Sequence, residues 1–245
     1  MKVVVFGGTK GMGRAVARQL FEAGNDVVLL GRNQEELDRS AADLSARRDG
    51  GKVATFLCDL EQVEGFDAAL DAADGALGNF DTVVVTAGLF ATQDKLEADP
   101  VFAHRVLLAN FTNTVMFCEN VRKRLLSRGG GTLCVFSSVA GDRGRKPVAI
   151  YGATKAGLTH YLDSLDYKFR AAGLKTICVK PGFVKTAMTA GLKPPPFAGE
   201  PEGVARIVVR AIKKGTPQVY APPMWRLIMM VIGMLPRFVM RRIGF

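Results

Sequence analysis

The feature that most constrains the fold is an alternation of short β-branched segments with longer segments of helical periodicity. The short segments predict strands at residues 2–6, 26–30, 53–58, 82–86, 131–137, 175–180 and 218–220. The longer ones predict helices at 11–23, 34–47, 65–77, 101–127, 149–172 and 202–214. Helices that connect successive strands of one sheet make those strands parallel. We therefore predict a single α/β, doubly wound domain over residues 1–222, with a seven-stranded parallel sheet flanked by helices.

The last part of the chain, residues 223–245, predicts a separate apolar and basic helical tail. The apolar run 227–235 is too short to cross a bilayer, which needs about 20 helical residues, and Pro236 would bend or end the helix. The net charge is +10, and after Glu202 the chain has no Asp or Glu but eight basic residues: Arg206, Arg210, Lys213, Lys214, Arg226, Arg237, Arg241 and Arg242. We expect this tail to lie on a membrane surface or to form an oligomer contact.

Other classes of protein fit the composition poorly. The excess charge lies near the C-terminus, without the interleaved aromatic residues that stack on bases, so we expect no nucleic-acid partner. Cys58, Cys118, Cys134 and Cys178 lack metal-ligand spacing, and we expect reduced cysteines and no metal site. The N-terminus begins directly with a strand and has no signal-peptide pattern. We therefore expect a cytoplasmic protein that can also lie, as a peripheral protein, on the cytoplasmic face of the membrane.

A glycine-rich segment follows the first predicted strand and opens the first helix. In such a turn Gly7 permits the tight bend, Gly11 lets the backbone approach a diphosphate, and Gly13 lets the helix pack closely on the strand. The N–H groups at the start of the helix attract an anion. The segment predicts a dinucleotide site that includes Gly7, Thr9, Lys10, Gly11, Met12 and Gly13.

The charges near this segment indicate which dinucleotide binds. Folds that bind NAD usually end the second strand with an acidic residue that holds the ribose 2′-hydroxyl. Here the strand is followed by Gly31, Arg32 and Asn33 instead. The guanidinium of Arg32 can pair with a 2′-phosphate, and Lys10 adds a second cation. We predict NADPH or NADP⁺ as the cofactor, with both Arg32 and Asn33 at its site.

A tyrosine and a lysine predict acid–base chemistry. Tyr151 and Lys155 are four residues apart in a helical segment, so their side chains lie on one face. A free tyrosine has a pKa near 10, and a neighbouring ammonium would lower it toward the working pH. Ser138 follows the predicted strand 131–137, at the sheet edge where ligands of α/β folds bind. We predict that these three residues act on a carbonyl group.

These motifs together resemble the short-chain dehydrogenase/reductase family over essentially the whole chain. The matching residues, in order, are Gly7, Gly11, Gly13, Asp59, Asn110, Ser138, Tyr151, Lys155, Pro181, Gly182 and Thr186. Two positions depart from the family pattern. Phe6 stands where a threonine is usual, and Val85-Thr86-Ala87-Gly88 stands where the family has Asn-Asn-Ala-Gly.

The resemblance implies a Rossmann fold and a role for each matching residue. Tyr151 would donate the proton, Ser138 would polarise the carbonyl, and Lys155 would hold the nicotinamide ribose and lower the tyrosine pKa. Asn110 would anchor a water molecule that relays protons. It also implies a homodimer or homotetramer and a cofactor site that extends to Asp59, Leu60, Ala87, Gly88, Tyr151, Lys155, Pro181, Gly182, Val184 and Thr186.

The substrate is less narrowly specified. The loop between Ser138 and Tyr151 carries Arg143, Arg145 and Lys146, which either bind a substrate phosphate or form a solvated turn. Together with the tail, the loop resembles reductases of polyprenyl-phosphate keto sugars. A second reading is a reductase of 3-ketosphinganine or 3-oxoacyl chains, which needs an apolar surface but no loop cations. A reading of another class is a non-catalytic, NADPH-sensing regulator.

Overall fold

The computed structural model describes residues 1–243, so the last two residues of the predicted tail lie outside the described part. It contains one seven-stranded sheet with the order β3-β2-β1-β4-β5-β6-β7, and every pair of neighbours is parallel. This confirms the predicted fold class. The strands are β1 Lys2–Phe6, β2 Asp26–Gly31, β3 Val53–Leu57, β4 Thr82–Val85, β5 Gly131–Phe136, β6 Leu174–Pro181 and β7 Gln218–Ala221.

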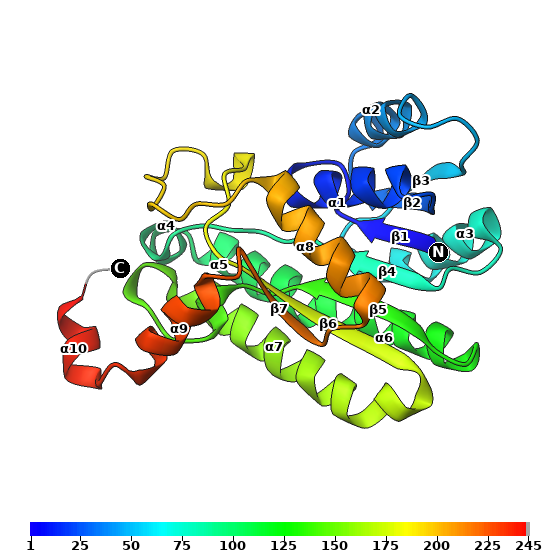
Figure 1. The fold of residues 1–245 in the computed structure, drawn as a ribbon. Coiled ribbons are helices and arrows are strands. Elements are labelled where there is room, and N and C mark those ends of the chain that lie inside the picture. Colours follow the sequence, from blue (N-terminus) through cyan, green and yellow to red (C-terminus); the bar gives the residue numbers. More distant parts are fainter. Residues whose placement is uncertain (244–245) are drawn as a thin grey trace.

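Helices cover both faces of the sheet (Figure 1). One face carries α1 Gly11–Glu22, α2 Gln34–Ser45 and α8 Pro201–Lys214. The other carries α3 Phe66–Leu77, α6 Thr114–Ser127 and α7 Ala149–Phe169. In β1, Val3 and Val5 point into the first layer, whereas Val4 and Phe6 point into the second. Because successive side chains of a strand alternate between the faces, a sheet that is covered on both sides needs this continuous apolar sequence.

Three helical regions differ from the prediction. The helix predicted at 101–127 is divided into α5 Pro100–Leu107 and α6 by a π-helical segment, Leu108–Asn113. A short helix, α4 Gln93–Ala98, was not predicted. The tail forms two helices, α9 Trp225–Met234 and α10 Arg237–Arg242, which are separated at Leu235 and Pro236 because proline has no N–H group to continue a helix.

The carboxyl ends of the strands define the functional edge of the sheet. The strand order reverses direction between β1 and β4, which is the position where open parallel sheets bind ligands. Helices α4, α9 and α10 lie at this edge, on the left of Figure 1. Among residues 1–243, no helix combines the length and the apolar character that a membrane span requires.

Candidate active site

The turn between β1 and α1 has the geometry expected of a diphosphate site. Gly7 has φ +89°, and a Cβ atom there would lie 2.6 Å from the Ala87 nitrogen. A Cβ atom on Gly13 would lie 2.2 Å from the Gly7 carbonyl oxygen. Lys10 precedes α1 and gives it no side-chain cap, so the first N–H groups of the helix can bind an anion. These residues fit the diphosphate of a dinucleotide.

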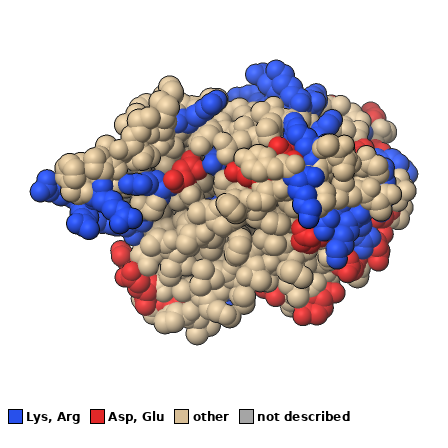
Figure 2. Space-filling model, turned by 90° about the horizontal axis from the view of Figure 1, so that it is seen from below, with Lys and Arg blue, Asp and Glu red and all other residues tan. Residues whose placement is uncertain are grey.

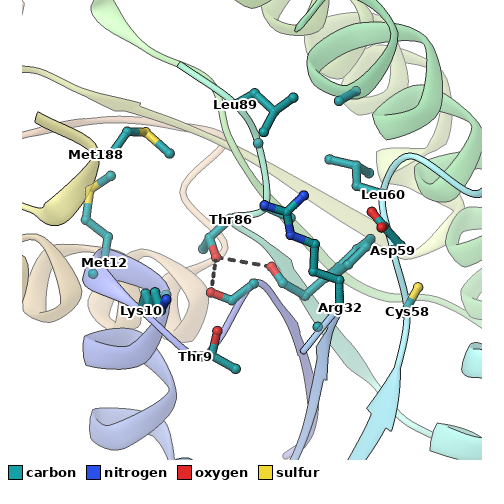
Figure 3. A pocket seen from close by; sticks show the side chains of 18 of the residues that line it. Thr9, Lys10, Met12, Arg32, Cys58, Asp59, Leu60, Thr86, Leu89 and Met188 are labelled. Carbon is teal, nitrogen blue, oxygen red and sulfur yellow. Dashed lines mark hydrogen bonds between the residues drawn. The ribbon is translucent and has the colours of Figure 1, made fainter. Parts of the chain in front are cut away.

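A cavity of about 290 Å³ lies above this turn (Figure 3). The residues of the predicted cofactor set that line it are Gly7, Thr9, Lys10, Gly11, Met12, Gly13, Arg32, Asp59, Leu60, Ala87, Gly88 and Thr186. Met12 and Met188 lie on one side in this view, opposite Arg32 and Asp59. Several further residues that line the cavity were not predicted to be part of the cofactor site, namely Phe6, Gly31, Cys58, Glu61, Thr86, Leu89, Ala109, Ala187 and Met188.

Thr86 explains how the chain tolerates its departure from the family pattern. The Thr86 hydroxyl lies 3.1 Å from the Phe6 carbonyl oxygen and 3.0 Å from that of Gly7, as the dashed lines of Figure 3 show. It therefore fastens the end of β4 to the glycine turn at the end of β1. A threonine stands here where the family pattern has asparagine, and this difference was the one sequence signal that could have identified Thr86 as a residue of the site.

The cations expected at the adenosine end of the cofactor have carboxylate partners. Arg32 lies 3.2 Å from Glu61, which also accepts a 2.7 Å bond from Arg105. Lys10 lies 3.5 Å from Glu36. The hydrogen bond from Arg105 is the main reason that the pKa of Glu61 is lowered. Arg32 still lines the cavity, with an exposed guanidinium.

Asn33, also predicted at this site, has a local structural role. Its side-chain oxygen accepts a 2.9 Å hydrogen bond from the Glu36 nitrogen and so caps the N-terminus of α2. It does not line the cavity. The sequence motif was ambiguous here because asparagine is both a common helix cap and a common ligand.

Three of the four predicted catalytic side chains come from two elements that meet at the carboxyl edge. Tyr151 and Lys155 lie in the first turns of α7, and Ser138 directly follows β5 and Ser137. The Lys155 amine donates a 2.9 Å hydrogen bond to the Phe136 carbonyl oxygen and lies 5.7 Å from the centre of the Tyr151 ring. Phe90 packs edge-on against this ring, with the two centroids 4.9 Å apart.

Burial sets the acidity of these groups. It raises the pKa of Tyr151 to about 12, while a hydrogen bond from Ser138 and the charge of Arg145 act in the opposite direction. Burial lowers the pKa of Lys155 to about 8. The expectation that Lys155 lowers the pKa of Tyr151 concerns the site with its cofactor bound and stays a prediction. In the protein alone, the Lys155 amine binds the Phe136 carbonyl oxygen, and burial has the largest effect on the pKa of Tyr151.

Asn110 lies in the π-helical segment between α5 and α6, and it is buried. Its amide exchanges two 2.7 Å hydrogen bonds with the backbone of Leu89. A Cβ atom on Gly88 would lie 3.0 Å from the Asn110 side-chain oxygen and 3.9 Å from the Lys155 amine. The π-helical turn therefore brings Asn110, Gly88 and Lys155 together, and such turns often occur at functional sites.

The segment after β6 contributes unequally to the cavity. Thr186 lines it, whereas Pro181 ends β6 and Val184 is buried in a bridge with Gly199. Gly182 packs against the indole of Trp225, whose nitrogen lies 2.0 Å from the place that a glycine Cβ would occupy. The tail thus contacts the functional edge through Trp225, a residue that was not predicted to be part of the site.

The structure separates the three cations of the loop 141–147. Arg143 donates a 2.9 Å hydrogen bond to the Leu235 carbonyl oxygen, and Lys146 donates one of 2.6 Å to that of Arg241. Both are therefore engaged with the tail. Arg145 has no carboxylate within salt-bridge distance among residues 1–243, its Nε atom is buried without a partner, and its charge acts on Tyr151.

The sequence is similar to those of known oxidoreductases. A family model described as short chain dehydrogenase matches residues 1–196. An uncharacterised oxidoreductase of Mycobacterium tuberculosis is 34% identical over 98% of this chain and 96% of its own. Carbonyl reductase family member 4 of Xenopus laevis is 29% identical over 84% of this chain and 88% of its own.

Solved structures also match the fold. An actinorhodin polyketide ketoreductase, solved with NADPH, has a TM-score of 0.79 and 25% identity, over 88% of this chain and 93% of its own. A short-chain dehydrogenase/reductase from Mycobacterium marinum has a TM-score of 0.81 and 22% identity, over 89% of this chain and 92% of its own.

Proposed function

Because the chain belongs to the short-chain dehydrogenase family, and is thus an oxidoreductase, we propose that it is an NADPH-dependent carbonyl reductase in which Tyr151 donates the proton. The observation that carries this proposal is the meeting of Tyr151, Ser138 and Lys155 at the carboxyl edge, beside a glycine turn that fits a dinucleotide. The non-catalytic alternative is disfavoured because all three side chains are present and close together.

Each residue of the proposed site has its own role in the reduction of a carbonyl group. Bound NADPH would supply a hydride to the carbonyl carbon. Tyr151, protonated at neutral pH because its pKa is about 12, holds a proton for the carbonyl oxygen, and Ser138 donates a hydrogen bond to that same oxygen. Lys155 would hold the nicotinamide ribose and Asn110 would position the water that returns a proton to Tyr151, as the resemblance implies.

The proposed preference for NADPH is supported by charge. Arg32 and Lys10 both line the cavity, and no acidic residue occupies the end of β2. Glu61 competes for Arg32, but it also holds Arg105 and would keep that partner when Arg32 turns to a 2′-phosphate. A bidentate guanidinium–phosphate pair is a strong charge-assisted interaction.

The proposed substrate is a lipid-linked or phosphorylated ketone such as a polyprenyl-phosphate keto sugar. Arg145, whose Nε atom is buried without a partner and whose charge acts on Tyr151, supports an anionic group near the reacting carbonyl. The chain also resembles the reductase subunit of decaprenylphosphoryl-ribose 2-epimerase in its Ser137–Ser138 pair, basic loop and tail. Reduction of 3-ketosphinganine or a 3-oxoacyl chain is the alternative, and it leaves Arg145 without a role.

Such a substrate would bring the enzyme to the cytoplasmic face of a membrane as a peripheral protein. We also propose a homodimer or homotetramer, formed through the long helices α6 and α7. Exposed apolar side chains on these helices, such as Met116 and Tyr167, support such a contact.

The decisive experiment follows NADPH oxidation with a polyprenyl-phosphate keto pentose, 3-ketosphinganine and a 3-oxoacyl thioester in parallel. We expect the keto sugar to give the highest kcat/KM. Tyr151→Phe should lower kcat at least about 100-fold, because the proton donor is lost. Tyr167→Phe, an exposed tyrosine of the same helix, is the control and should keep full activity. Full turnover by Tyr151→Phe would contradict the mechanism.

A further inference from the structure

Helix α9 has two apolar faces with different surroundings. Trp225, Met229 and Ile232 are buried in one cluster with Val139, the residue that follows Ser138. The opposite face exposes large apolar side chains, with Leu227 63% and Met234 74% exposed. A helix on the surface of a domain normally buries one apolar face and presents polar groups on the other. Packing within the domain therefore does not explain why this opposite face of α9 is apolar.

The inner face belongs to the edge that carries the site. Trp225 lies against Gly182, and the loop 141–147 is attached to the tail by hydrogen bonds from Arg143 to the Leu235 carbonyl and from Lys146 to the Arg241 carbonyl. Each cation binds a carbonyl near the end of a tail helix, where the helix leaves its carbonyl groups unpaired. The tail is therefore held beside Ser138 and Tyr151.

The same loop is fastened to the sheet. Asp142 accepts a 2.7 Å bond from Lys180 of β6 and a 2.9 Å bond from Tyr220 of β7. Because Lys180 is buried, this ion pair is shielded from solvent. The attachment runs from the sheet through Asp142 to the loop and from the loop to α9 and α10.

The outer face combines apolar and cationic character. We define it as Leu227, Met230, Val231, Met234 and Phe238, all more than half exposed. It is accompanied by four exposed arginines, Arg226, Arg237, Arg241 and Arg242. Figure 2 shows basic side chains gathered at the end of the molecule that carries α9 and α10, on the left.

This combination suits an anionic bilayer better than a second copy of the chain. An isologous contact would place the same face of both subunits together and would bring their arginines close to each other. The tail has no acidic residue that could neutralise them, because the chain has none after Glu202. Anionic head groups offer the opposite charge, and the acyl region receives the apolar side chains.

We propose that the outer face docks on an anionic lipid bilayer while the inner face stays attached to the site, so that the mouth of the site opens at the bilayer. The docking itself does not depend on the reaction. Only its consequence, that a lipid-linked ketone reaches Tyr151 from the bilayer, rests on the proposed function.

The test is co-sedimentation of the full chain with vesicles of phosphatidylglycerol or of phosphatidylcholine. We expect at least about tenfold tighter binding to phosphatidylglycerol, because each arginine near an anionic surface adds to the affinity. Leu227→Ser combined with Met234→Ser should weaken this binding at least about tenfold. The matched control is Val101→Ser combined with Leu57→Ser, which removes comparably exposed apolar side chains from α5 and β3 and should bind as the parent does.

The other outcomes overturn the proposal. Equal binding to both lipids would exclude charge recognition, and equal loss in the control variant would assign docking elsewhere. If the Leu227→Ser, Met234→Ser variant instead lowers the oligomeric state in light scattering, a second copy covers the face. The variant should keep its rate with a water-soluble ketone, and since vesicle binding needs no turnover, failure of either proposal is seen separately.

Discussion

Lys10 and Lys155 are both assigned to the cofactor, yet their surroundings give them different properties. Lys10 is largely exposed and forms an ion pair with Glu36. Lys155 is buried, and burial lowers its pKa to about 8. The residue type therefore shows only that a side chain able to carry a positive charge is present. Burial decides whether that cation is retained at the working pH.

A substitution of Arg32 tests the proposed preference for NADPH. Arg32→Asp should remove a charge-assisted pair with the 2′-phosphate and place a repulsive carboxylate there. The ratio of kcat/KM for NADPH to that for NADH should fall about 10- to 100-fold in steady-state assays. Arg39→Asp, which alters an exposed arginine of α2 outside the cavity, should leave the ratio unchanged. An unchanged ratio in the Arg32 variant would mean that the enzyme selects its cofactor by other contacts.

At the scale of elements, charged side chains fasten helices that share a face of the sheet. Asp43 of α2 lies 2.7 Å from Arg18 and 3.6 Å from Arg14, both of α1, and 3.1 Å from Arg47. Burial raises the pKa of Asp43, but hydrogen bonds from Arg18 and Arg47 outweigh it and hold the pKa at about 2. The carboxylate is thus stabilised in the folded state.

Asp43→Asn should lower the free energy of unfolding by about 1 kcal/mol near pH 7, measured by urea denaturation. Because the folded pKa lies below the ordinary value of 3.8, this contribution is present above about pH 4 and is lost as the pH falls toward 2. The difference between variant and parent should shrink accordingly. Asp38→Asn, an exposed residue of the same helix, should change stability little at either pH. A loss that does not depend on pH would refute this account.

At the scale of the molecule, the tail is joined to the domain through one aromatic side chain and two backbone-directed cations. Trp225 is the only tryptophan in the chain, so its fluorescence reports the position of α9 alone. The indole occupies the space that a side chain at position 182 would need. Glycine at this position is therefore required by the tail as well as by the cofactor site that the family resemblance implies.

Gly182→Ala should displace Trp225, shift its emission to longer wavelength and lower stability by about 1–3 kcal/mol, since the added methyl group overpacks a filled site. Gly233→Ala is the control within α9, because a Cβ atom there meets nothing within 4 Å. It should leave the emission unchanged and favour the helix slightly. An unshifted emission in the Gly182 variant would show that the tail does not pack as described.

Local periodicity and short motifs were enough to predict the seven strands, most helices and the glycine turn, and they identified Tyr151, Lys155 and Ser138 as candidate catalytic residues. The hydrogen-bond partner of each cationic side chain depends on the tertiary structure. Arg143 and Lys146 bind carbonyl groups 92 and 95 residues away, and Arg32 binds a carboxylate 29 residues away. The tertiary structure also decided the high pKa of Tyr151. Burial and distant contacts arise only when the chain is folded, so no local pattern encodes them.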